Sequence, residues 1–183
     1  MNASAFVVGA RDGASAALQD IARAIGFMPV ERYSGVVRAE RQVRNTPLMF
    51  FLCAEVADVN ELKPTADAIR FSANADLRFS PLIYFTHQAS TETIKLCIRF
   101  GFDDVIALPY SGGDLRERVF RQIGRPFIYY ETATYFGPDR RNRVGDSRSS
   151  SSDHGGGQYR RIEIMRTAES GVSVLHDDFQ VVV

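Results

Sequence analysis

The stretch FGFDDVIALPYSGGDL, residues 100–115, contains the pattern from which the fold of this 183-residue chain can be inferred. It ends one helix at a glycine, continues into a short apolar strand and leaves that strand through a proline, after which a second helix begins. A helix, a buried strand and another helix in close succession indicate a parallel sheet, because parallel strands require long crossover connections.

The same alternation occupies the first two-thirds of the sequence. Short, nearly continuous apolar runs are typical of strands that are buried on both faces. The most apolar run, PLMFFLCAEV, predicts a central strand. We expect strands within 5–10, 28–33, 47–56, 81–87 and 104–110, and helices within 14–27, 35–44, 59–79, 90–102 and 112–124. Pro64 must occupy a first helical turn or produce a kink. Right-handed crossovers then predict a flavodoxin-like five-stranded parallel sheet of order 2-1-3-4-5, flanked by helices.

The composition and the hydrophobic pattern of the sequence change after Pro126, so we predict one domain over 1–126 and a C-terminal extension over 127–183. Residues 127–136 alternate and are rich in Tyr and Thr, which predicts a β arm. Residues 137–158 are rich in Gly, Ser and charge, which predicts a flexible loop. Residues 159–183 predict a hairpin that turns at Ser170–Gly171. A hairpin alone is marginally stable in water, so we expect it to dock on the sheet domain or on a second copy.

Composition excludes several classes of function. Basic and acidic residues number 22 each and are evenly mixed, which disfavours nucleic-acid binding. No apolar run approaches the ~20 residues of a membrane helix, and the first residues lack the pattern of a secretory signal. Cys53 and Cys97 stand without the spacing of a zinc site or a disulfide framework. We therefore expect a cytoplasmic protein without a metal or another cofactor.

The segment from Gly101 to Tyr110 resembles the end of the receiver domain of two-component response regulators. In that family a Gly-x-Asp-Asp segment precedes the last strand and Lys-Pro-Phe follows it; here the strand is followed by Leu-Pro-Tyr. The resemblance covers residues 4–125. It implies a reaction in which a histidine kinase passes a phosphoryl group to an Asp at the end of the third strand. An acidic pair holds a divalent cation, and a Lys and a Ser or Thr contact the phosphoryl oxygens.

Most of these family positions are occupied by residues that cannot perform the reaction. The acidic pair falls on Gly9 and Ala10, the phospho-acceptor on Cys53 and the lysine on Leu108, and only Thr86 keeps the family's residue type. A hard cation needs oxygen ligands, and a phosphoryl dianion needs fixed positive charge. The resemblance therefore implies a degenerate receiver, a pseudo-receiver, with no catalytic residue and no enzymatic activity.

Two alternative assignments concern this edge of the sheet. Asp12 and Glu55 are nearby acids that could replace the lost ones, but no lysine stands near the end of the fifth strand. Cys53 could be a reactive thiol, alone or paired with His87. We favour a small apolar residue that fills the space of the lost metal site, with His87 exposed on a loop.

We therefore expect a phosphorylation-independent, receiver-like signalling module that acts by protein contact and forms a homodimer. The contact face is predicted on the fourth helix, fifth strand and fifth helix, at Lys95, Arg99, Phe102, Asp104, Tyr110, Arg116 and Arg118. The arm 127–136 could add a strand across the dimer or cover a sheet edge. The alternative is a sensor of a small, nucleotide-type ligand that binds in the altered crevice of Gly9, Cys53, Thr86, His87 and Leu108.

Overall fold

A computed structural model describes residues 3–139 and 158–181 of the chain. The first part contains β1 (Ala3–Val8), α1 (Gly13–Ile25), β2 (Val30–Arg32), α2 (Val36–Val43), β3 (Leu48–Cys53), a 3-10 helix η1 (Val59–Leu62), α3 (Lys63–Arg70), α4 (Ala75–Arg78), β4 (Leu82–Thr86), α5 (Thr91–Arg99), β5 (Asp104–Ala107) and α6 (Gly112–Phe120). The second part contains β6 (Pro126–Glu131), β7 (Phe136–Pro138), β8 (Gln158–Thr167) and β9 (Gly171–Val181). The predicted loop 137–158 lies almost wholly outside the described residues.

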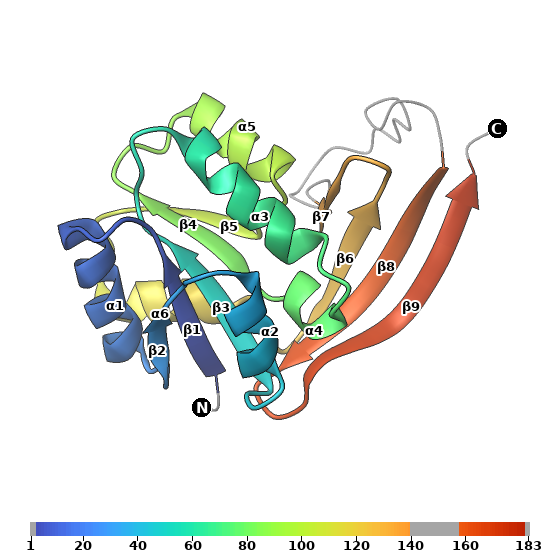
Figure 1. Cartoon of the computed structure of the whole chain (residues 1–183), viewed down its shortest axis with the longest axis horizontal. Helices are drawn as coiled ribbons and strands as arrows, with labels where there is room; N and C mark the ends of the chain where they lie inside the picture. The colour runs from blue at the N-terminus through green and yellow to red at the C-terminus, as the bar shows by residue number, and fades with distance from the viewer. Residues whose placement is uncertain (1–2, 140–157, 182–183) are drawn as a thin grey trace.

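The parallel sheet has the predicted order β2-β1-β3-β4-β5, which is the flavodoxin-like arrangement (Figure 1). Each adjacent pair of strands in it is parallel. The predicted helix over 59–79 is divided into η1, α3 and α4, and Pro64 lies in the first turn of α3, where its missing N–H costs no hydrogen bond. Within the described residues, no helix combines the length and apolar character needed to cross a bilayer.

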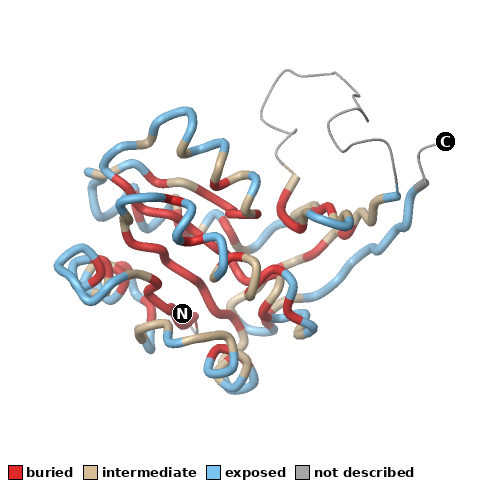
Figure 2. The backbone as a smooth tube through the Cα atoms, turned by 45° about the horizontal axis from the view of Figure 1, so that its top comes forward, coloured by how far each residue is buried: buried red, intermediate tan, exposed pale blue. Residues whose placement is uncertain are grey.

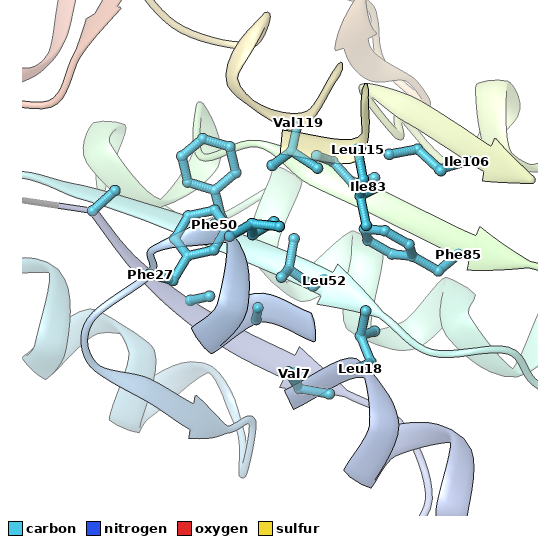
Figure 3. Close-up of a cluster of buried hydrophobic side chains, with 14 of the residues drawn as sticks. Val7, Leu18, Phe27, Phe50, Leu52, Ile83, Phe85, Ile106, Leu115 and Val119 are labelled. Atoms are coloured by element: carbon cyan, nitrogen blue, oxygen red, sulfur yellow. The ribbon is translucent and has the colours of Figure 1, made fainter. Parts of the chain in front are cut away.

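Two hydrophobic clusters cover the two faces of this sheet. On one face, α1 and α6 bury side chains such as Leu18 and Leu115 against Phe50 and Phe85 (Figure 3). On the other, α2, α3, α4 and α5 pack against alternate residues of the same strands, including Phe51 and Cys53. The alternation arises because successive strand residues point to opposite faces, so a continuous apolar run supplies both clusters.

The C-terminal extension forms a second, antiparallel sheet of order β7-β6-β8-β9, which we call sheet B. The predicted arm 127–136 is two strands rather than one, because the chain turns at Thr132–Tyr135, where the Thr132 N–H donates to the Tyr135 carbonyl. The predicted hairpin is present as β8 and β9.

Sheet B docks on its own chain, at the amino-terminal ends of β3, β4 and β5 (Figure 1). Phe79, which precedes β4, packs with Tyr129, Phe136, Ile162 and Ile164 in a third buried cluster. The expectation that the hairpin must dock is thus met within one chain.

Glycines allow backbone to approach backbone where sheet B meets the parallel domain. Gly101 adopts a left-handed φ of +78°, and a Cβ there would collide with the Phe136 carbonyl. A Cβ on Gly137 would lie 2.8 Å from the Cα of Gly101. The β6–β7 hairpin therefore lies directly against the α5–β5 turn, with no side chain of these glycines between them.

Candidate functional site

The carboxyl-terminal edge of the parallel sheet is where open α/β folds usually bind ligands. Cys53 ends β3 at this edge and is only 1 % exposed, within the cluster under α2, α3 and α5. Burial raises the pKa of the Cys53 thiol well above its ordinary value. A buried, protonated thiol is a poor nucleophile, and its surroundings agree with the interpretation of Cys53 as an apolar filler.

Gly9 and Ala10 follow β1 at the same edge. A Cβ placed on Gly9 would lie 2.5 Å from Ser15 Oγ and 3.1 Å from the Cβ of Ala54. The Ser15 hydroxyl is buried and has no hydrogen-bond partner. Ser15 therefore occupies the space that an acidic side chain at position 9 would need. The Gly9 carbonyl accepts a hydrogen bond from Arg32 Nη2 at 2.9 Å.

Glu55, Thr86 and His87 form a hydrogen-bonded cluster between β3 and β4, which we call the Glu55 cluster. Thr86 Oγ1 donates to Glu55 Oε1 at 2.6 Å, and the His87 amide donates to the same oxygen at 3.0 Å. The His87 Nδ1 lies 2.7 Å from Glu55 Oε2. These contacts lower the pKa of Glu55, mainly through the hydrogen bond from Thr86. His87 therefore pairs with Glu55 and not with Cys53.

The remaining positions of this edge do not suit the family's cation or phosphoryl group. Leu108 is half-buried and packs against the cluster under α1 and α6. Asp12 is the N-cap of α1 and accepts from the Ser15 amide at 2.9 Å. Among the residues that the structure describes, no group of three or more His, Cys, Asp or Glu side chains could hold a metal ion. The divalent cation implied by the resemblance therefore does not fit the residues present.

The structure brings together only some of the residues predicted for the contact face. Lys95 and Arg99 are exposed on α5. On β5 and α6, Arg118 donates to both carboxylate oxygens of Asp104 at 3.1 Å and to the Tyr110 hydroxyl at 2.9 Å. The hydrogen bond to Asp104 is the main cause of a raised pKa for Arg118. Asp104, Tyr110 and Arg118 are therefore a fixed group beside α5.

Two predicted members of that face lie elsewhere. Phe102 is fully buried in the cluster under α2, α3 and α5, because Gly101 ends α5 in the left-handed conformation and turns the next residue back onto the helix. The Phe102 amide donates to the Cys97 carbonyl at 3.0 Å. Arg116 is on the other side of α6, where its Nη1 donates to the Ile25 carbonyl at 2.8 Å. Both predicted placements were wrong.

The opposite end of the sheet contains a buried charged group that sequence reasoning missed. Asp103, directly before β5, accepts hydrogen bonds from Arg70 Nη2 at 2.5 Å and from Arg166 Nη2 at 2.9 Å. Its carboxylate also accepts from the Leu82 amide at 2.8 Å and from the Tyr129 hydroxyl. The side chains of Arg70, Asp103 and Arg166 are at most 1 % exposed. We call Asp103 with these four partners the Asp103 cluster.

Both arginines also donate hydrogen bonds to backbone carbonyls around this cluster. Arg70 also donates to the carbonyls of Gly101, Arg78 and Ser80, and Arg166 to that of Phe79 at 2.7 Å. Burial alone would raise the pKa of Asp103, but the guanidinium groups of Arg166 and Arg70 outweigh it and hold the pKa at about 2. Because Tyr129 and Arg166 belong to sheet B and Arg70 to α3, the cluster fastens sheet B to the parallel domain.

A cavity of about 870 Å³ lies beside this junction, between α6 and the start of sheet B. Its lining is strongly polar and carries both signs of charge, with Asp114, Glu117, Arg121 and Arg125 among the residues. The mixed charge does not point to one class of small ligand.

Comparisons with known proteins give matches only among solved structures. No protein-family model matches the chain, and no curated protein matches its sequence. The chain is similar to the receiver domain of a sensor histidine kinase from Pseudomonas aeruginosa, solved with a magnesium ion in its active-site cleft, at 18% identity and a TM-score of 0.46, covering 66% of this chain and 97% of that one.

Two further solved structures are similar over a comparable share of the chain. One is a CheY-like protein from Pseudomonas aeruginosa, at 11% identity and a TM-score of 0.49, covering 65% of this chain and 98% of that one. The other is the receiver domain of a histidine kinase from Syntrophus aciditrophicus, at 19% identity and a TM-score of 0.43, covering 65% and 89%. At these identities the likeness concerns the fold, and the function is argued from the residues of the chain itself.

Proposed function

We propose that this chain is a receiver-like signalling module that acts without phosphorylation and without enzymatic activity, by protein contact and as a homodimer. The observation that carries the proposal is the closed carboxyl edge of the sheet. Cys53 is buried, the space beside Gly9 is filled by Ser15, and the Thr86 hydroxyl is bound to Glu55. Each of these features removes a group or a space that phosphoryl transfer needs.

Electrostatics supports the same proposal. Transfer to a carboxylate brings two anionic groups together and depends on nearby positive charge. At the end of β5 the family's lysine is replaced by Leu108, which packs against apolar side chains. Among the described residues, Glu55 is the one acid whose carboxylate bonds to the end of β4, and both of its oxygens already accept hydrogen bonds.

A surface that acts by contact should be held in one conformation, and the Asp104–Arg118–Tyr110 group has that property. Arg118 bonds at once to a carboxylate, a hydroxyl and the Val105 carbonyl. Lys95 and Arg99 add exposed positive charge on the neighbouring helix. The partner that we expect is therefore a protein with acidic groups facing α5.

The competing proposal, a small-ligand sensor in the altered crevice, has less support. Of its five predicted residues, Cys53 and Thr86 are buried and Leu108 packs against the core. His87 is exposed but bound to Glu55. A clear rise in melting temperature with a cyclic dinucleotide or another nucleotide, lost in a His87→Ala variant, would reverse our preference.

Incubation with acetyl phosphate and Mg²⁺, followed by intact-mass measurement, tests the main proposal. We expect an unmodified mass under conditions in which an active receiver domain in the same tube is phosphorylated. The variant Glu55→Gln is the matched control, because it removes the carboxylate nearest to Thr86. A phospho-adduct on the wild-type chain would overturn the proposal, and its loss in Glu55→Gln would identify the acceptor.

A further inference from the structure

Sheet B leaves one long strand edge without a partner in the described part of the chain. Its order places β6 and β8 inside the sheet and the three-residue strand β7 at one edge. The other edge is β9, which has 11 residues. The predicted alternatives for the arm 127–136 are a strand added across a dimer and a cover for a sheet edge; its strand β6 is paired on both sides within the chain. The free backbone donors and acceptors belong to β9.

The exposure of β9 is unusual for its apolar content. Residues 173–180 are all exposed, and Val174, Leu175 and Phe179 are exposed by 48%, 44% and 64%. Figure 2 shows this run as a continuous exposed stretch that leads away from the parallel domain. Proteins protect such edges with charged side chains, proline or a bulge; β9 has no lysine or proline, and its charged residues are Asp177 and Asp178. A bulge at Leu175, which has no partner in β8, is the one irregularity of the strand.

The sequence of β9 is suited to antiparallel pairing with the β9 strand of a second copy when the pair is centred on Asp177. If two copies pair antiparallel with Asp177 opposite Asp177, then Leu175 of each faces Phe179 of the other, and His176 faces Asp178. Directly opposite residues in a regular antiparallel pair point to the same face of a sheet. His176 and Asp178 are both in regular register with β8, so each imidazole meets a carboxylate on a common face. Leu175 is the bulged residue, so its contact with Phe179 requires the two strands to pair across the bulge.

Repulsion between the two Asp177 carboxylates at the centre does not disfavour this register, because each carboxylate has its own positively charged partner. Arg160 Nε donates to Asp177 Oδ1 at 2.6 Å, and Arg160 also lies 3.4 Å from Glu131. Centring the pair on Asp178 would set two carboxylates against each other, and it would set Asp177 against Phe179. Centring it on His176 would set Leu175 against an acid. The register about Asp177 is therefore favoured.

We propose that two copies of the chain associate by pairing β9 with β9 about Asp177, so that two four-stranded sheets become one continuous eight-stranded sheet. The proposal rests on the homodimer of the proposed function and names its interface. β8 and β9 extend beyond the parallel domain, and the free edge of β9 faces away from it (Figure 1), so a second copy can approach.

Cysteine pairs test the register directly. His176→Cys and Asp178→Cys chains should form a mixed disulfide dimer when combined under mild oxidation, because both positions are in regular register and opposite residues in antiparallel strands have Cα atoms about 4.5–5.5 Å apart. Each variant alone should cross-link much less, since neither residue faces itself. Cys53 and Cys97 are buried and give a low background. Val37→Cys, which is 60% exposed on α2, is the matched control.

Light scattering after gel filtration tests the interface independently of cross-linking. The wild-type chain should be a dimer, Phe179→Lys should shift it to monomer, and Val37→Lys should leave it dimeric. The β9 interface would be overturned if Phe179→Lys remained a dimer, or if the mixture of cysteine variants cross-linked no better than each variant alone. Either outcome would leave the homodimer itself standing. A monomeric wild-type chain would overturn both, whereas the acetyl phosphate result does not depend on either.

Discussion

The two ends of the parallel sheet differ in where their polar groups are placed. At the carboxyl end, the Glu55 cluster lies near the surface, where His87 is 66% exposed. At the amino end, the Asp103 cluster is buried and connects α3, the start of β5 and two strands of sheet B. The sequence resemblance to receiver domains implies essential charges at the first end. In this chain the buried charge lies at the second end, where it fastens one sheet to the other.

Of the variants that test this difference between the two ends of the sheet, Asp103→Asn should lower the free energy of unfolding most. It would leave Arg70 and Arg166 buried without a counter-charge, and breaking a buried pair in this way costs about 3–5 kcal/mol. We expect the free energy of unfolding in urea to fall by that amount. Hydrogen exchange should rise more in β8 and β9 than in β1 and β3, because sheet B loses its attachment.

Asp20→Asn is the matched control, because its ion pair with Arg23 is exposed and such pairs contribute little. A loss in Asp103→Asn no larger than that of the control would mean that the Asp103 cluster does not hold the sheets together.

A variant Gly9→Ala should have an intermediate effect at the opposite end. The new Cβ would meet Ser15 Oγ at 2.5 Å, and crowding a packed site costs about 1–3 kcal/mol. Thermal unfolding should show the loss, and adding Ser15→Ala should recover part of it. Gly35→Ala is the control, since Gly35 also has a positive φ, of +123°, and nothing lies within 4 Å of its added Cβ. If Gly9→Ala were as stable as Gly35→Ala, the space would be open and an acid could be restored there.

A variant Glu55→Gln should give the smallest effect, visible as a change in pH dependence. The pKa of Glu55 is lowered from its ordinary value of 4.5, so the carboxylate contributes stability above that pH, and the contribution disappears as pH falls through the lowered value. The difference in free energy of unfolding between wild type and variant should be below about 1 kcal/mol at neutral pH and should shrink in acid. Glu92→Gln controls for net charge, and an equal pH profile in both variants would contradict the prediction.

Local apolar pattern was enough to predict the parallel sheet and its order. The continuous apolar run Leu48–Cys53 supplies side chains to the hydrophobic clusters on both faces of the sheet. Cys53 is buried because it belongs to one of these clusters. The same pattern could have excluded Arg116 from the contact face, because residues two apart on a helix do not share a side with Arg118. Gly101 gave a further signal, since an apolar residue after a left-handed helix end commonly packs back on the helix.

The Asp103 cluster could not be predicted in this way. Its carboxylate meets Arg70 across 33 positions of sequence and Arg166 across 63. These contacts depend on how sheet B docks, and docking is decided by tertiary packing and not by any local period. The division of 127–136 into two strands was missed for a related reason, because alternation continues through the turn at Thr132–Tyr135.

The close contact of Gly101 with Gly137 has a mechanical consequence. Side chains between packed elements can change rotamer and absorb a small displacement, but here backbone meets backbone. A shift of the α5–β5 turn would therefore displace the backbone of the β6–β7 hairpin directly, because no side chain of these glycines lies between the two to take up the movement. The joint between the two sheets is stiff at this point.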